Sequence, residues 1–362
     1  MLTIFTTPKP FRGHEDVIQQ NAWRSWSLLE PKPEVLVLDA AEGAARVAGE
    51  LGFRYLPDVA RNEFGTPLIR SLFQQGQDNA RFPIVCYVNS DVILLNDFMA
   101  TVAEVAGSQR EGEYLLVGRR WNVAIAEPVR FDALDWQSRL LRRVGEEGWQ
   151  ESPAAMEFFA FSRGVRWEFP DFAVGRGAWD GWLLHQARSK GLRVIDASMR
   201  ITLIHQQHDY SHWREGDRYY VRSQEYRTNQ RLRGSFRRQY TILDASHRLT
   251  AEGSLYPSTA GEHGRANLLR VQMYVADRLR AGGPYTAPVL GALKWMRRRI
   301  TPGERSSGGA PTTVREPISE QRTHPASKNG SNVFGELRQA GREEQKVNVP
   351  DAEAMLLVGD GF

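Results

Sequence analysis

The most informative stretch of the sequence is IVCYVNSDVILL, residues 84–95. Its apolar run is interrupted by Asn89-Ser90-Asp91 and then resumes. Continuous apolar residues rich in Val and Ile are typical of a strand that is buried on both faces, as in a parallel sheet. A carboxylate at the end of such a strand is costly to bury unless it meets a metal, a cation or solvent, and ligands of open α/β sheets gather at the carboxyl ends of the strands. Asp91 is therefore a candidate site residue, although Asn, Ser and Asp also favour ordinary turns.

Strands and helices are expected to alternate around this segment. Strands are predicted at residues 3–8, 34–39, 53–56, 84–89, 113–121, 158–161 and 200–205. Helices are predicted at residues 16–29, 42–51, 68–80 and 179–190. This alternation indicates βαβ units and a parallel sheet, and right-handed crossovers favour a doubly wound topology. The predicted fold class is α/β, with a mostly parallel sheet flanked by helices and a helical or disordered C-terminal extension.

The chain of 362 residues is long enough for one large α/β domain with additions, or for two domains. We expect the folded domain to cover residues 1–250 and a helical extension to cover residues 251–300. Residues 301–362 are rich in Gly, Ser, Pro, Glu and Arg and lack sustained periodicity. We predict that this tail is largely disordered.

The bulk properties also bear on location. Cys86 is the single cysteine, so no internal disulfide is expected, and a reducing compartment is favoured. The first residues lead straight into a predicted strand, which argues against a signal peptide. No apolar stretch approaches the roughly twenty residues that span a bilayer. We therefore expect a cytoplasmic protein, either soluble or peripheral to the inner face of the membrane.

Positive charge is concentrated in residues 214–238, where eight arginines stand against three acidic residues. The usual explanation of such a block is a solvated helix face, but it can also bind phosphate, nucleic acid or anionic lipid. Each basic residue contributes about 1 kcal/mol near an anionic membrane. We predict a peripheral membrane contact here and no nucleic-acid partner.

Two further polar groups flank predicted elements. The glycine-rich residues 175–179 lead to Asp180 at the start of a predicted helix, where an acidic residue is also favoured simply as a cap. His205, His208 and His212 follow a predicted strand, and clustered histidines suit a metal ion. Their spacing matches no zinc signature, so a single His that assists a divalent ion is the preferred interpretation, with surface histidines as the alternative.

Weaker candidates lie at other strand ends. These polar residues are Thr6, Thr7, Asp39, Arg61, Asn62, Arg119 and Arg120. Arg suits phosphate through its paired donors, whereas an Asp before a helix also suits a cap. Trp121, Trp179 and Trp182 could form an apolar platform for a sugar, although aromatic residues at a helix start usually belong to the core.

In their order along the chain, these residues resemble the glycosyltransferases of the GT-A fold, particularly family 2 of the nucleotide-diphospho-sugar transferase superfamily. The resemblance covers about residues 2–250 and implies a nucleotide-binding half at 1–120 and an acceptor half at 121–250. It implies that Thr6 and Thr7 meet the nucleotide and that Asp39 contacts base or ribose.

The same resemblance assigns the reactive centre. Residues 60–65, with Arg61-Asn62, are similar to the family's segment ahead of its metal motif, and Asn89-Ser90-Asp91 resembles its Asp-X-Asp motif, with Asp91 as metal ligand. Asp180 matches the catalytic base of inverting members, and His205 or His208 matches the metal-binding His. The chain departs from the pattern at Asn89, which replaces the first Asp, and at Trp179-Asp180, which replaces a Glu-Asp pair.

The resemblance implies a metal-dependent transfer of sugar from a nucleoside-diphosphate sugar to a hydroxyl acceptor, with inversion at the anomeric carbon. The acceptor would be a glycan, a lipid-linked molecule or a small molecule. Breaking a sugar–diphosphate bond builds negative charge on the leaving nucleotide, and Mn²⁺ or Mg²⁺ stabilises that charge through oxygen ligands such as Asp91. Arg119 or Arg120 would add to this clamp, together with Asn89 and Ser90 beside the donor.

Two other functions fit the same residues. A sugar-phosphate nucleotidyltransferase of related fold would need a Gly-rich phosphate loop, of which Lys9, Arg12 and Gly13 give only a faint version. An inactive nucleotide- or glycan-binding protein would explain Asn89 as a lost ligand.

Overall fold

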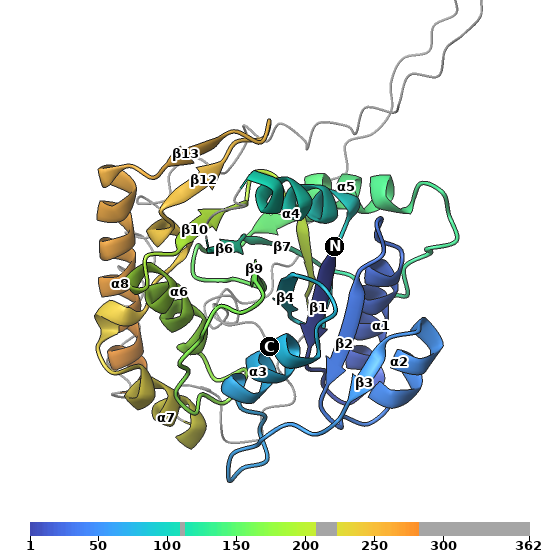
Figure 1. Cartoon of the computed structure of the whole chain (residues 1–362), viewed down its shortest axis with the longest axis horizontal. Coiled ribbons are helices and arrows are strands. Elements are labelled where there is room, and N and C mark those ends of the chain that lie inside the picture. The colour runs from blue at the N-terminus through green and yellow to red at the C-terminus, as the bar shows by residue number, and fades with distance from the viewer. Residues whose placement is uncertain (109–112, 208–222, 282–362) are drawn as a thin grey trace, which may run out of the picture. The chain divides into compact units, whose positions relative to one another are not determined.

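The computed structural model describes residues 1–108, 113–207 and 223–281 (Figure 1). The predicted disordered tail, the last part of the predicted helical extension, His208 and the first part of the Arg-rich segment lie outside these residues. No helix within the three described ranges is long and apolar enough to cross a membrane.

A nine-stranded sheet forms the centre of the fold. Its strands are β1 (Leu2–Thr6), β2 (Glu34–Leu38), β3 (Arg54–Leu56), β4 (Ile84–Val88), β6 (Tyr114–Val117), β9 (Phe158–Ser162), β10 (Arg193–Asp196), β12 (His247–Leu249) and β13 (Leu255–Pro257). They lie in the order β13-β12-β10-β6-β9-β4-β1-β2-β3. Neighbouring strands are parallel except where β9 and the edge strand β13 run antiparallel. The predicted α/β class with a mostly parallel sheet is therefore confirmed.

From β1 the chain passes to β2 and β3 on one side of β1, and it then crosses back to β4 on the other side. This is the topological switch at which ligands of doubly wound sheets bind. Because β4 and β6 are both antiparallel to β9, they are parallel to each other. The carboxyl ends of β1, β2, β4 and β6 therefore meet at one edge of the sheet, where the amino end of β9 also lies.

Helices cover both faces of the sheet (Figure 1). They are α1 (Gly13–Ser27), α2 (Ala44–Leu51), α3 (Ile69–Asn79), α4 (Asn96–Ser108), α5 (Trp136–Glu147), α6 (Trp179–Ser189), α7 (Gln224–Arg233) and α8 (Ala260–Ala281), with short 3₁₀ helices at Phe236–Arg238 and Ile242–Asp244. The predicted helices at 16–29, 42–51, 68–80 and 179–190 correspond to α1, α2, α3 and α6. None of the predicted helices corresponds to α4 or α5.

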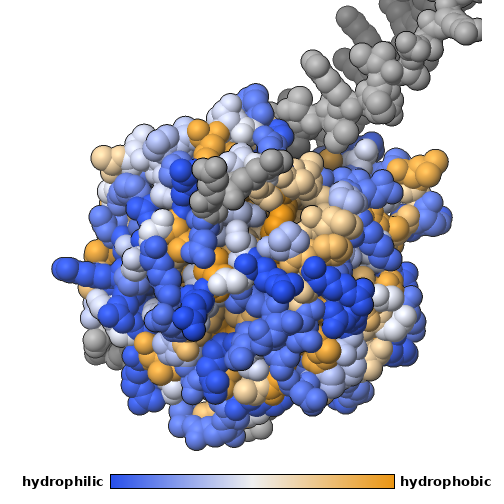
Figure 2. Space-filling model, viewed as in Figure 1, coloured by the Kyte–Doolittle hydropathy of each residue, from blue (hydrophilic) through white to orange (hydrophobic). Residues whose placement is uncertain are grey.

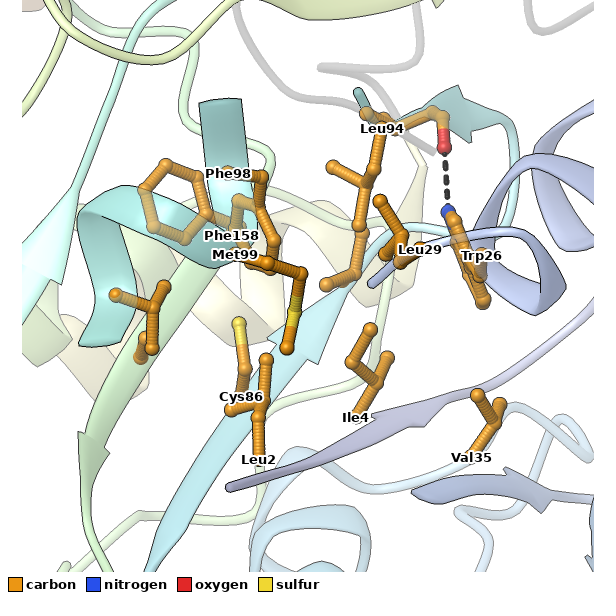
Figure 3. Packing of buried hydrophobic residues seen from close by; sticks show 14 of the residues in the cluster. Leu2, Ile4, Trp26, Leu29, Val35, Cys86, Leu94, Phe98, Met99 and Phe158 are labelled. Atoms are coloured by element: carbon orange, nitrogen blue, oxygen red, sulfur yellow. Dashed lines mark hydrogen bonds between the residues drawn. The ribbon is translucent and has the colours of Figure 1, made fainter. Parts of the chain in front are cut away.

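The two faces of the sheet bury alternate residues of the same strands, because successive side chains of a strand point to opposite sides. Ile4 and Cys86 belong to a cluster that includes residues of α1, α2 and α4, part of which is seen in Figure 3. There the indole Nε1 of Trp26 donates to the Val92 carbonyl at 2.8 Å. Phe5 belongs to the opposite cluster, with residues of α3 and α6. This packing on both sides explains why the strands are apolar throughout.

A second, four-stranded sheet has the order β5-β11-β7-β8. Its strands are β5 (Val92–Ile93), β11 (Leu203–Gln206), β7 (Arg120–Val123) and β8 (Trp149–Gln150). The single strand predicted at 113–121 is therefore wrong, since β6 and β7 belong to different sheets. The change of sheet follows Gly118, where a Cβ atom would lie 2.9 Å from the Phe158 ring. Only a residue without a side chain lets the backbone approach that ring so closely.

The last described part of the chain extends the central sheet beyond residue 250. Strand β13 pairs with β12, and α8 follows from Ala260. Figure 2 shows one face of the molecule, on which hydrophilic side chains predominate and hydrophobic ones are scattered.

Candidate functional site at the carboxyl edge of the sheet

Asp91 and His205 meet where the two sheets adjoin. Asp91 lies in the turn between β4 and β5, and the residue after it, Val92, pairs with His205 on β11. The Nε2 atom of His205 is 3.8 Å from Oδ2 of Asp91, and each residue is only 3% exposed. The antiparallel pairing of β5 with β11 thus brings together two residues that lie far apart in the sequence.

The other side of the His205 ring contacts an amide group, and that amide group is itself bound by a carboxylate. Its Nδ1 atom is 3.0 Å from Oδ1 of Asn122 on β7, and Nδ2 of Asn122 donates to Glu151 at 3.0 Å. A carboxylate only accepts, so the Asn122 amide group faces Glu151 and its oxygen faces the ring. The Nδ1 atom therefore carries a proton, so that in the neutral ring the lone pair lies on Nε2, which faces Asp91.

A second polar group lies under the turn. Glu157, the residue directly before β9, accepts from Nη1 of Arg120 and from Nδ2 of Asn89. The backbone is joined there as well, because the Asn89 N–H donates to the Glu157 carbonyl at 3.0 Å. Glu157 and Arg120 have no solvent exposure. Burial raises the pKa of the Glu157 carboxyl, the nearby Asp91 charge adds to that increase, and Arg120 and Asn89 oppose it.

Asp91 and His205 fit a divalent cation as a partial ligand set. The described ranges contain no group of three or more His, Cys, Asp or Glu residues placed to hold a metal. Mg²⁺ commonly takes one or two carboxylates and fills its other positions with water and substrate phosphates, whereas Mn²⁺ also accepts imidazole. The 3.8 Å between Oδ2 of Asp91 and Nε2 of His205 is a separation that two ligands of one such ion can span.

The residues predicted to bind the nucleotide lie at the ends of the neighbouring strands. Thr6 and Thr7 follow one another at the end of β1, and their hydroxyl oxygens are buried without a hydrogen-bond partner among the residues described. Asp39, at the end of β2, is 5% exposed and has a φ of 117°. Such a positive φ is uncommon for a residue other than Gly and is often found at functional sites.

Arg61 binds Asp39 through Nη2 and the Gly65 carbonyl through Nη1. Burial raises the pKa of the Asp39 carboxyl, and the Arg61 charge partly offsets that increase. Asn62 is used inside its own loop, where its oxygen accepts from Thr66 N at 2.9 Å and its amide donates to Glu225 at 2.7 Å. The structure thus brings Arg61 to Asp39, while the side chain of Asn62 ties its loop to α7.

Ser90 and the two predicted phosphate-binding arginines have protein partners. The Ser90 hydroxyl donates to Gln19 on α1 at 2.9 Å. Arg119 donates through Nε to the Glu151 carbonyl at 3.0 Å, and Arg120 is the buried partner of Glu157. Arg120 therefore lies beneath the turn instead of at an open phosphate site, because its charge is matched by a carboxylate in the interior.

Asp180 lies in the first turn of α6, where it is 4% exposed. Its Oδ1 accepts from Gly181 N at 2.7 Å. The helix begins after Ala178, which has a φ of 73°. Trp179, the preceding residue, packs edge-on against Tyr87 of β4 with ring centroids 5.5 Å apart. This contact holds the start of α6 beside the last residues of β4.

The predicted tryptophan platform is not formed as such. Trp179 packs against Phe73 and Phe159 as well as Tyr87, and Trp182 packs against Phe169 and Phe172. Both are core residues, because α6 turns its apolar side onto the sheet. Trp121 is half-buried and packs against the smaller cluster beside β5 and β11.

Sequence reasoning missed Glu157, Asn122 and Glu151. Glu157 directly precedes an apolar strand, whereas Asp91 was identified because it follows one. Asn122 follows Arg120-Trp121, but its role depends on the pairing of β7 with β11, which places it opposite His205. No local pattern marks Glu151.

Neither a protein-family model nor a curated protein matches the sequence. Among solved structures, Staphylococcus aureus TarS in complex with UDP-GlcNAc matches with 15% identity and a TM-score of 0.42, over 68% of this chain and 67% of that chain. Glucosyl-3-phosphoglycerate synthase from Mycobacterium tuberculosis in complex with Mn²⁺, UDP and glucosyl-3-phosphoglycerate matches with 18% identity and a TM-score of 0.35, over 59% and 74%. A further TarS structure matches with 13% identity and a TM-score of 0.27, over 34% of this chain and 36% of that chain. In that last comparison the matched region is about a third of the TarS chain.

Proposed function

We propose that the protein is a metal-dependent glycosyltransferase that moves a sugar from a nucleoside-diphosphate sugar to a hydroxyl acceptor. The observation that carries this proposal is the buried pair of Asp91 and His205 at the carboxyl edge of the sheet, with 3.8 Å between Oδ2 and Nε2. The pair lies beside the topological switch of a doubly wound sheet, which is where such folds bind their ligands.

The donor would lie along the strand ends between Asp39 and Asp91. The buried hydroxyls of Thr6 and Thr7 supply donors and acceptors to the nucleotide at the end of β1. Asp39, held by Arg61, is suited to accept from a base or a ribose hydroxyl. These residues follow successive parallel strands, so one extended ligand can contact all of them.

Asp91 and His205 would hold Mn²⁺ or Mg²⁺. The cation would supply Lewis-acid stabilisation of the charge that develops on the leaving diphosphate. Asn122 contributes by fixing the ring so that Nε2 offers a lone pair, and the buried Asp91 contributes the negative charge that attracts the ion. Because Asp91 and His205 are buried, the low polarity of their surroundings strengthens both interactions.

Asp180 is our proposed catalytic base. Deprotonation of an acceptor hydroxyl requires a base within hydrogen-bond reach, on the side of the sugar opposite the leaving diphosphate. The packing of Trp179 on Tyr87 supports this assignment, because it ties the first turn of α6 to the strand that leads to Asp91. A base on that side gives inversion at the anomeric carbon. We assign donor binding to residues 1–120 and acceptor binding to residues 121–250.

The test is a screen of UDP-, GDP-, CMP- and dTDP-sugars for binding, hydrolysis and transfer, with and without Mn²⁺. Wild type is compared with Asp91→Ala, Asp180→Asn and the control His247→Gln, which alters a half-buried histidine on β12. We expect Asp91→Ala to lose metal-dependent turnover and Asp180→Asn to lose transfer while it still binds donor. Full activity in both variants would refute the site, and pyrophosphate release from a nucleoside triphosphate with a sugar phosphate would indicate nucleotidyl transfer instead.

A further inference from the structure

Asn89 occupies the position at which the chain departs from an Asp-X-Asp pattern, and its side chain has a defined partner. Its amide Nδ2 donates to Oε2 of Glu157, and its backbone N–H donates to the Glu157 carbonyl at 3.0 Å. The register explains this double contact, because Val88 is opposite Phe158 in the β4–β9 pair, so the residue after β4 meets the residue before β9.

Glu157 in turn is fixed from its other oxygen. Oε1 accepts from Nη1 of Arg120, and both side chains have no exposure to solvent. A buried ion pair of this kind is tolerated when further hydrogen bonds satisfy its remaining oxygens. The Asn89 amide supplies such a bond, because it offers hydrogen atoms to the carboxylate.

An aspartate at position 89 would reverse this arrangement. A carboxylate offers no hydrogen atom at neutral pH, so two acceptors would face each other in the interior. A carboxylate at position 89 would also face the Glu157 carboxylate in the interior, with the Asp91 carboxylate two residues further along the chain, and like charges repel strongly where no water separates them.

We propose that Glu157 is a positioning residue that requires an amide at position 89, so that Asn89 is its matched donor and not a weakened metal ligand. The pair holds the end of β4 through one side-chain bond and one backbone bond, two residues before Asp91. Together these contacts fix the backbone from which Asp91 faces His205. The effects on catalysis depend on the proposed glycosyl transfer, whereas the effect on stability does not.

The test is a double-mutant cycle with Asn89→Asp, Glu157→Gln and the combination of both. In the combined variant the amide and the carboxylate exchange places. The new amide at position 157 can donate to the new carboxylate at position 89, and its oxygen can still accept from Arg120. The number of buried carboxylates is then that of the wild type. Each protein is measured for thermal unfolding, for the Mn²⁺ concentration that gives half-maximal donor hydrolysis, and for kcat and KM of the donor.

We expect Asn89→Asp to lower kcat by at least about 10-fold, to leave Mn²⁺ affinity unimproved and to lower Tm by roughly 5 °C or more. The combined variant should recover most of the Tm and at least about a third of the kcat, since contacting residues are coupled. Tighter Mn²⁺ binding and undiminished activity in Asn89→Asp would overturn the proposal, because they would make position 89 a metal ligand. Additive losses in the combined variant would also overturn it.

The two proposals can fail separately. If wild type shows no turnover with any donor, the proposed glycosyl transfer fails, and the Tm cycle still decides whether Asn89 and Glu157 are matched. Non-additive Tm changes would support the pair, and additive ones would refute it.

Discussion

The Nδ1 atom of His205 lies 3.0 Å from Oδ1 of Asn122, and Nδ2 of the same amide donates to Glu151 at 3.0 Å. The carboxylate fixes the amide, the amide fixes the ring, and the ring turns Nε2 toward Asp91. Chains of this kind orient metal ligands and raise their affinity. The neutral His205 ring, which could otherwise adopt either tautomer, is thereby held with its proton on Nδ1.

Removal of the amide should therefore weaken metal binding without removing a ligand. We expect Asn122→Ala to lower the apparent Mn²⁺ affinity by about 10- to 100-fold and to leave the KM of the donor at saturating Mn²⁺ nearly unchanged. The measurement is Mn²⁺-dependent donor hydrolysis. Asn79→Ala is a suitable control, because the Asn79 side chain donates to the Gln75 carbonyl within α3 at 3.0 Å. Equal Mn²⁺ affinity in wild type and Asn122→Ala would show that the ring needs no such support.

Asp97, in the first turn of α4, should make stability depend on pH. Burial raises its pKa from 3.8 to about 6, although its carboxylate accepts from Thr202 N at 2.8 Å. Because the folded state holds this proton more tightly than the unfolded state, the free energy of unfolding falls as pH rises from about 4 to about 6. The full loss is on the order of 3 kcal/mol above pH 6, since each pKa unit corresponds to about 1.36 kcal/mol.

Asp97→Asn removes the charge and keeps an oxygen for Thr202. We expect this variant to be more stable than wild type above about pH 6 and to lose that advantage below about pH 4. Urea unfolding at several pH values measures both effects. A variant that is less stable than wild type at a pH of about 7.5 would show that the carboxylate is ionised at little cost.

Because Arg120 and Glu157 form a buried ion pair, we expect a single substitution to cost more stability than a double one. Arg120→Met leaves Glu157 buried without its guanidinium, which should cost about 3–5 kcal/mol. Arg120→Met combined with Glu157→Leu should recover most of that loss, since apolar residues of similar volume replace buried ion pairs well. Activity should stay low in both variants. Arg120→Met disturbs Glu157, which accepts the hydrogen bond from Asn89, and the double variant removes that acceptor. Urea unfolding with a parallel activity assay tests this, and equal stability losses in the two variants would contradict it.

Two helical glycines offer a matched pair for the packing of the core. A Cβ at Gly76 of α3 would lie 2.6 Å from the Phe5 ring, whereas a Cβ at Gly107 of α4 meets nothing within 4 Å. Gly76→Ala should therefore destabilise the protein by about 1–3 kcal/mol through overpacking. Gly107→Ala should stabilise it by up to about 1 kcal/mol, because Ala is the better helix former. Thermal unfolding measures both, and a stabilising Gly76→Ala would mean that α3 shifts freely against β1.

The sequence by itself determined the class of the fold and the edge at which a site belongs. Buried strands rich in Val, Ile and Leu alternate with helices, and this pattern depends only on local residue preferences and on burial on two faces. The same local signal, a carboxylate at the end of an apolar run, identified Asp91 and Asp39. It also placed Asp180 at a helix start, because glycines and an acidic residue mark such a position.

The tertiary structure decided which residues meet. Glu157 lies opposite Asn89 because β9 runs antiparallel between β4 and β6, and Asn122 lies opposite His205 because β7 leaves the central sheet at Gly118. Neither pairing leaves a periodic trace in the sequence, since both depend on strand register between distant segments. The packing of α6 also buries Trp179 and Trp182 in the core. Arg120 lies in the interior because it pairs with Glu157. Residue type and local sequence pattern identified the candidate site residues, and the register between distant strands determined which of them face one another.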